Sequence, residues 1–249
     1  MISKTAGYLP FLFFIVIIAI GYTTGQTGIP VEDGGELLTV ARLGGVNHPP
    51  GLPLVSLSSR FSWILFGDQG LRVLFALFAA GTLLMLQRSR NIASLIFSAG
   101  LLLLPPVAGR FLMWDAYSPL LLVFAFTMLT RPAPDLAGGY LTGIALAIHP
   151  QGILLPVLFS WKRISPFRFA AGLVLGLSIY LALPVGSSGG WLVDWGSADT
   201  AGEFMHMITA GGYREVYGSS IGSLSLASVM LYLRSIEEII WPVLLVPAA

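Results

Sequence analysis

The sequence contains no cysteine and few charged residues. Without cysteine the chain has no disulfide, no thiolate metal ligand and no cysteine nucleophile. Charged residues make up 10% of its 249 residues, against about 25% in a typical soluble domain. A net charge of +1 leaves no basic excess to hold nucleic acid. These absences exclude a soluble enzyme and a nucleic-acid-binding protein. With 55% hydrophobic residues and a mean hydropathy of +0.83, the composition indicates a protein that uses lipid as its solvent.

Long charge-free runs mark the expected membrane spans, because a helix needs about 20 apolar residues to cross a bilayer core. The runs are Tyr8–Thr24, Val73–Gln87, Asn91–Gly109, Ala116–Thr130, Leu136–Trp161 and Phe169–Val193. The last run, Ile239–Ala249, would extend only about 16 Å as a helix, so it predicts an unfinished span. The expected fold class is therefore all-α, a single polytopic integral membrane domain over 1–249 with about seven membrane segments.

The basic residues predict the orientation, because short cytoplasmic connectors carry an excess of Lys and Arg. Keeping Lys162 and Arg163 on the cytoplasmic side requires the run before them to turn back. Its middle, His149-Pro150-Gln151-Gly152, favours a turn and predicts a hairpin of two short helices, about 138–149 and 152–161. With a cytoplasmic N-terminus, eleven of the twelve carboxylates then lie on the outer face.

Two outer loops follow from this topology, about 25–71 and about 185–238. In the first loop, the segment that starts Asp33-Gly34-Gly35-Glu36 and the stretch Leu52–Phe66 each predict an amphipathic interfacial helix. His48-Pro49-Pro50-Gly51 breaks the chain between them. Asp-x-x-Glu before an apolar run is also typical of a helix capping box, so a structural role for the two carboxylates stays an alternative to a functional one.

The order of these segments resembles the membrane glycosyltransferases of the GT-C superfamily. It resembles more closely a polytopic family of formerly unknown function that includes a eukaryotic protein O-mannosyltransferase. The family pattern D-S-G-E followed by H-P-P-G-x-P-L reads here Asp33–Glu36 and His48–Leu54, with Gly34 in place of serine. The resemblance covers residues 9 to about 241 and implies a GT-C-like helical bundle.

Three later segments match in the same order. Asp115-Ala116-Tyr117 stands where the family has E-x-Y, and His149 stands where it has a histidine in a glycine-rich apolar segment. The family stretch W-G-[DN]-P … G-F-x-W-H-[VI] … Y-R corresponds to three segments of the last outer loop: Asp194-Trp195-Gly196, Glu203–Ile208 and Tyr213-Arg214. The last stretch departs from the pattern at Ser197-Ala198 and at Met205.

The resemblance implies transfer of a sugar from a polyprenyl-phosphate donor to a hydroxyl acceptor (protein, lipid or glycan) at the extracytoplasmic face. The acceptor hydroxyl must lose its proton as it attacks, and a carboxylate can remove that proton. Asp33 is the expected general base and Glu36 the expected orienting group, although the two roles are exchangeable.

Residues expected to bind the donor phosphate or the rest of the substrate share a polar or aromatic side chain in the matched segments or just beyond a span: Arg110, Arg214, His48, Asp115, Tyr117, His149, Trp195 and His206. Structural alternatives exist for several. The arginines could reach lipid headgroups, Trp195 could belong to an interfacial belt, and His149 could be a neutral ring bonded to a carbonyl exposed by Pro150. No H-E-x-x-H spacing indicates zinc. No cofactor is implied beyond the donor, with a divalent ion at Asp33 and Glu36 as an alternative.

Two rival functions remain at this stage. Broken helices and an intramembrane histidine are also features of transporters or flippase-like proteins, although no inverted repeat is evident. A truncated, non-catalytic relative that acts as a subunit of a partner membrane protein is the other. The expected partners are membrane lipids and the lipid-linked sugar, in a cell membrane if the source is prokaryotic or the endoplasmic reticulum if it is eukaryotic.

Overall fold

The computed structural model describes residues 33–87, 116–160 and 165–212, and these are mostly helical. The α-helices are α2 (Asp33–Leu43), α3 (Pro53–Gln87), α6 (Tyr117–Thr130), α7 (Leu136–Ile148), α8 (Pro166–Leu177), α9 (Ala182–Ser188) and α10 (Ala201–Ile208). Two 3-10 helices, η2 (Pro150–Leu158) and η3 (Ser178–Leu181), and two short strands, β1 (Gly45–Val46) and β2 (Val193–Asp194), complete the described part. The expected spans Tyr8–Thr24, Asn91–Gly109 and Ile239–Ala249 lie outside the described residues.

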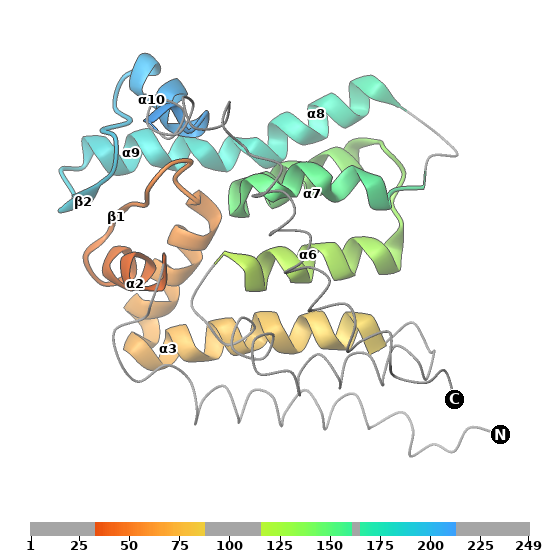
Figure 1. The fold of residues 1–249 in the computed structure, drawn as a ribbon, viewed down its shortest axis with the longest axis horizontal. Helices are drawn as coiled ribbons and strands as arrows, with labels where there is room; N and C mark the ends of the chain where they lie inside the picture. The colour runs from red at the N-terminus through yellow and green to blue at the C-terminus, as the bar shows by residue number, and fades with distance from the viewer. Residues whose placement is uncertain (1–32, 88–115, 161–164, 213–249) are drawn as a thin grey trace, which may run out of the picture.

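Four helices form the body of the fold. Figure 1 shows α3, α6, α7 and α8 lying roughly parallel in successive layers, with α2, β1, β2 and α10 gathered at one end. Leu71 and Phe75 of α3, Leu120 of α6 and Ile148 of α7 meet in a shared buried cluster. A second cluster beneath α9 and α10 contains Val46, Tyr180, Leu183 and Met207. The two clusters hold the gathered end of the molecule against the helical layers.

Two stretches are long and apolar enough to cross a membrane, Pro53–Thr82 and Pro166–Ser188. The second joins α8, η3 and α9 into one nearly continuous helix. Both keep large apolar side chains exposed, among them Phe61, Phe66 and Phe167. Such a surface is suited to lipid contact, and it is costly in water. The expected helical class and membrane association are thus supported at the level of helix content and span length.

Helix α3 is divided at Gly67, whose backbone is not helical, with φ 61° and ψ −150°. The break falls where the expected interfacial helix ends. It is shorter than expected, because the helix resumes directly after Gly67 and includes the residues expected to form a loop. Across the kink a Cβ atom at Gly70 would lie 2.3 Å from the carbonyl oxygen of Ser62. The positive φ of Gly67 and the missing side chain of Gly70 together permit this bend.

The hairpin predicted around His149 is present. His149 is extended, with φ −161° and ψ 145°, and α7 ends there. Beyond it η2 folds back onto α7, so closely that a Cβ at Gly152 would lie 2.3 Å from the carbonyl carbon of Ala145. The amides of Ser160 and Ser165 donate to the carbonyls of Pro132 and Pro134, at 3.0 and 3.1 Å, which returns the chain to the start of α7. The returning arm is a 3-10 helix in place of the expected α-helix, and it contains Pro156, which has no amide proton to donate.

Glycines allow the backbones of α7 and α8 to touch. A Cβ at Gly139 would lie 2.0 Å from the carbonyl oxygen of Phe169, and one at Gly172 would lie 2.0 Å from that of Leu136. One turn further, Gly143 and Gly176 face each other at similarly short range. Small residues spaced four apart are a common way to pack helices in lipid, where close van der Waals contact replaces the hydrophobic effect.

Adding one methyl group at this contact is expected to separate the two helices. Gly139→Ala should destabilise the protein by about 1–3 kcal/mol, because neither backbone can move aside without disturbing the other glycine contacts. Thermal unfolding in detergent micelles measures the effect. Gly202→Ala in α10 is the matched control, since the nearest atom to its added methyl group is 4.0 Å away, and it should be neutral or slightly stabilising. Equal melting temperatures for the two variants would contradict the packing described.

Candidate functional site

The carboxylate of Glu36 joins the motif that begins at Asp33 to the motif that begins at His48. One of its oxygens, Oε1, accepts the backbone N–H of His48, and the other, Oε2, lies 2.5 Å from Nδ1 of the same residue. The side chains are mostly buried, with exposed fractions of 19% for Glu36 and 17% for His48. The residues are 12 positions apart in the chain. Helix α2 and the His-Pro-Pro-Gly turn therefore form one structural unit.

This contact shows that Glu36 does not close a capping box. In a capping box Glu36 would reach back to the backbone at Asp33, but its carboxylate reaches forward to His48. Asp33 lies in the first turn of α2, where its negative charge is favourable beside the positive end of the helix dipole. The side chain of Asp33 is exposed. The carboxylate of Glu36 is thus held by hydrogen bonds, while the side chain of Asp33 is exposed at the surface.

The imidazole of His48 is held in one tautomer. An ionised carboxylate only accepts hydrogen bonds, so Nδ1 of His48 carries the proton that faces Glu36. The hydrogen bond to Glu36 and the negative charges of Glu36 and Asp33 raise the pKa of His48 above its usual value, against the opposing effect of burial. The ring consequently keeps a positive charge to higher pH than an exposed histidine.

The turn after His48 fixes the backbone that carries it. The amide of Gly51 donates to the carbonyl of His48 at 2.7 Å, and the peptide bond between Pro49 and Pro50 is cis. Gly51 has φ +92°, and a Cβ there would lie 2.8 Å from Cδ1 of Leu183, so a larger residue would clash. On the other side of His48, the buried Asn47 donates from Nδ2 to Oγ of Ser56 on α3. No motif in the sequence indicated this anchoring role of Asn47.

A second histidine faces the same region from the hairpin. Nδ1 of His149 accepts the amide of Gln151 at 3.2 Å, so the ring caps η2, which is a structural role. The ring of Tyr117, the first residue of α6, lies 4.9 Å from that of His149, centroid to centroid. Asp33 and His48 both act electrostatically on His149. The structure therefore brings together five of the predicted residues from α2, the turn, α6 and the hairpin.

The segment that runs from β2 to α10 docks beside the same turn. Strand β1 pairs in parallel with β2, and the amide of Trp195 donates to the carbonyl of Val46. Met207 of α10 packs where Gly51 and Gly196 leave room, with Sδ 3.3 Å from a Cβ built at Gly196. The side chains predicted to act there are less engaged. Trp195 is 53% exposed, and a Cβ at Gly211 would lie 2.4 Å from Nδ1 of His206, which shows that this ring packs on the helix end.

The described arginines of the first loop have structural partners. Arg42 forms an ion pair with Asp68, and Arg60 donates to the carbonyls of Ala41 and Arg42 at the C-terminus of α2. The guanidinium of Arg60 also stacks over Trp63. These contacts account for both side chains without a substrate. The favoured phosphate ligands Arg110 and Arg214, and with them Asp115, lie outside the described residues.

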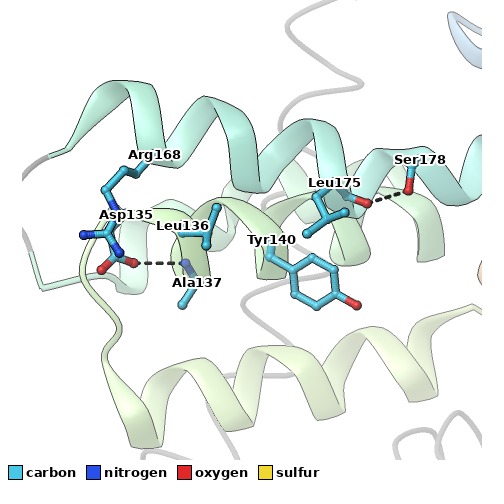
Figure 2. Close-up of a pocket in the computed structure, with 7 residues that line it drawn as sticks. All are labelled: Asp135, Leu136, Ala137, Tyr140, Arg168, Leu175 and Ser178. Carbon is cyan, nitrogen blue, oxygen red and sulfur yellow. Dashed lines mark hydrogen bonds between the residues drawn. The ribbon is translucent and has the colours of Figure 1, made fainter.

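A pocket of about 560 Å³ lies elsewhere, along α7 and α8 (Figure 2). Its lining is mostly apolar with Asp135 and Arg168 at one end, and Asp135 caps α7 by accepting the amide of Ala137 at 3.0 Å. Helix α7 separates Asp135 from His149 by its 13 residues, about 20 Å at the usual rise. None of the described candidate residues lines this pocket. It is therefore a separate feature from the cluster around Glu36 and His48.

The described residues hold no group of three or more His, Asp or Glu side chains arranged to bind a metal ion. The chain matches no protein-family model, no curated protein and no solved structure. Arguments about function therefore depend on the geometry of the cluster and on the sequence motifs that it unites.

The Glu36–His48 contact should be measurable as a coupling free energy. A double-mutant cycle with Glu36→Gln and His48→Gln is expected to give about 1–3 kcal/mol near neutral pH, as for a hydrogen bond between charged groups. Because the folded pKa is raised, the coupling is complete below the ordinary value of 6.5 and falls as the pH rises through the folded value.

The matched control is the exposed pair Arg42–Asp68, which also starts from α2 but joins it to α3. Its coupling should be under about 1 kcal/mol and independent of pH between about pH 6 and 9, because neither group titrates there. Unfolding monitored by tryptophan fluorescence in detergent measures both cycles. A coupling of zero for Glu36 and His48, or one that rises with pH, would contradict the geometry.

Proposed function

We propose that this chain is a membrane glycosyltransferase that moves a sugar from a polyprenyl-phosphate donor to a hydroxyl acceptor. The supporting observation is that Asp33, Glu36, His48, Tyr117 and His149 gather at one end of the helical layers although the sequence spreads them over more than a hundred positions. Each belongs to a segment that resembles the GT-C pattern.

In this proposal Asp33 is the general base. Both oxygens of Glu36 are already engaged with His48, so the exposed carboxylate of Asp33 is the better placed of the two to take the acceptor's proton. As the acceptor oxygen bonds to the anomeric carbon, the bond from that carbon to the phosphate oxygen breaks on the opposite face. One base on the attacking side is sufficient for this inverting displacement.

The leaving phosphate requires positive charge in place of a strong acid. Beside the proposed base the cationic group is His48, while Arg110 and Arg214 are proposed as phosphate ligands on the sequence pattern. Tyr117 and His149 offer a polar ring pair for the sugar or the acceptor, and Trp195 an exposed aromatic face that sugars commonly stack on. Asp115 and His206 remain proposals from the pattern. Water and lipid can reach this end of the molecule because Asp33 and Trp195 are exposed.

We place the site on the extracytoplasmic side from the basic residues of the connectors that follow α6 and precede α8, which favour the cytoplasm. The cluster of candidate residues lies at the opposite end of the layers from these connectors (Figure 1). Arg42 and Arg60 also lie at the end of the cluster, where they bind Asp68 and the C-terminus of α2. The cluster would then face outward, on the side where lipid-linked sugars serve as donors because nucleotide sugars are absent.

Replacement of Asp33 by Asn should abolish sugar transfer without disturbing the fold. We expect transfer by Asp33→Asn to fall about 10²–10⁴-fold, since the amide cannot accept the proton. Mass spectrometry of glycoconjugates, in cells that carry only the variant, measures the loss. Asp135→Asn is the control, because it makes the same chemical change at the far end of α7 and Asn caps a helix as well as Asp does.

Full transfer by a stably expressed Asp33→Asn protein would exclude Asp33 as the base. Transport of a solute by the purified protein, with glycoconjugates unchanged by its deletion, would favour the transporter alternative instead. Activity restored only by a second membrane chain would identify the protein as a subunit.

The orientation can be tested with single cysteines, because the chain has none of its own. Ala133 and Ser165 lie just before α7 and α8. These two segments are neighbours, because the amide of Ser165 donates to the carbonyl of Pro134, the residue after Ala133. Cysteines at these two positions should react with a membrane-impermeant maleimide only from the cytoplasmic side, and a cysteine at Asp199 only from the outer side. Labelling of positions 165 and 199 from the same side would overturn the proposed topology.

A further inference from the structure

We infer that Glu36 is a positioning residue that holds His48 as an imidazolium. In this form His48 binds the phosphate group, first in the polyprenyl donor and then in the polyprenyl phosphate that leaves. The inference rests on the proposed function and assigns Glu36 a role different from that of a second base. The same pair would make phosphate recognition, and not proton removal from the acceptor, the pH-sensitive part of the site.

The geometry supports positioning because Glu36 contacts His48 at two points. Its Oε1 binds the backbone amide and its Oε2 faces Nδ1 of the ring, so the ring cannot rotate about its side-chain bonds without losing the second contact. Nε2 lies on the other edge of the ring and is directed away from Glu36. The turn that follows, closed by the bond from Gly51 to the carbonyl of His48, fixes the backbone as well.

The surrounding charges keep the ring cationic. From α2, Glu36 and Asp33 both favour the charged form of His48, and burial disfavours it. From the hairpin, His149 interacts unfavourably with His48 when both carry charge. These are the titratable groups of the described residues that act on His48. The two carboxylates outweigh the other effects, so the pKa of His48 is raised overall.

A cation at this position fits the chemistry of the leaving group. When the bond between the anomeric carbon and the phosphate oxygen breaks, the electron pair remains on that oxygen and the phosphate gains a second negative charge. The imidazolium of His48 can donate a hydrogen bond to it, or its proton, giving the monoanion and a neutral ring. The acceptor's proton passes separately to Asp33, and exchange with solvent restores both residues after the products leave.

The test uses the full-length protein in nanodiscs and a defined probe, undecaprenyl monophosphate, with undecaprenol as the ligand that lacks phosphate. Binding is measured at about pH 6 and about pH 8.5 for the wild type, Glu36→Gln, His48→Gln and Asp68→Asn. Asp68 is the matched control because its carboxylate binds an arginine on the same helix as Glu36. Thermal unfolding of each variant shows whether the fold is retained.

We expect the wild type and Asp68→Asn to prefer the phosphate over the alcohol at about pH 6, and to retain more of that preference at about pH 8.5 than Glu36→Gln does, because the hydrogen bond to Glu36 raises the pKa of His48. Glu36→Gln should bind the phosphate normally at low pH, where its histidine is still protonated, and about tenfold more weakly at high pH. His48→Gln should be about tenfold weaker at both. Restoration of Glu36→Gln by acid alone would not follow from a merely structural role.

Three results would overturn the inference, and they separate it from the proposed function. Phosphate binding by Glu36→Gln and His48→Gln equal to the wild type at both pH values would overturn the inference and leave the glycosyltransferase proposal standing. So would a loss in Glu36→Gln that does not depend on pH. A wild-type protein without preference for the phosphate over the alcohol would contradict both.

Discussion

The contact between Glu36 and His48 is the interaction on which the rest of the site depends. It joins the first turn of α2 to a turn that follows β1 and precedes the long helix α3. Strand β1 in turn pairs with β2, which brings the segment from Val193 onward to the same place. The other polar contacts of α2 with α3, made by Arg42 and Arg60, lie at the far end of α2.

The packing of α7 against α8 is the second constraint, and it positions the hairpin at His149. Helices α7 and α8 touch through their glycines, and η2 folds back on α7 from the break at His149. The close backbone contact leaves little freedom for the end of α7, so His149 is presented on a rigid support beside Tyr117. A substrate site built on such supports keeps its geometry better than one built on loops alone.

The sequence predicted the features that local physics decides. The proline that follows His149 ends α7, because it cannot continue the hydrogen-bond ladder of the helix, and the apolar spacing after Asp33 is that of a helix. The sequence could not predict that the chain resumes a helix directly after Gly67, because the close approach of Gly70 to Ser62 exists only in the folded chain. Nor could it assign Glu36 to His48, since a capping box and a partner 12 residues away have the same local pattern and only the fold decides between them.

The same reasoning explains why individual arginines were hard to assign. Arg42 and Arg60 are arginines close to the motifs in the sequence, as phosphate ligands would be. In the structure their side chains hold α2 against α3. Such pairings depend on distances across helices, which spacing along the chain does not reveal. The residue types therefore indicated the chemistry of the site, but they did not show which of several arginines would contact a substrate.

The central claim, that Glu36 holds a charged His48 within this site, can be tested by NMR. The chain has three histidines, so the full-length protein labelled with ¹⁵N-histidine in nanodiscs gives three imidazole signals, and His48→Gln identifies one of them. The account predicts that this ring is protonated at Nδ1, with a pKa above 6.5 that falls in Glu36→Gln. A His48 ring whose titration is unchanged by Glu36→Gln would contradict it.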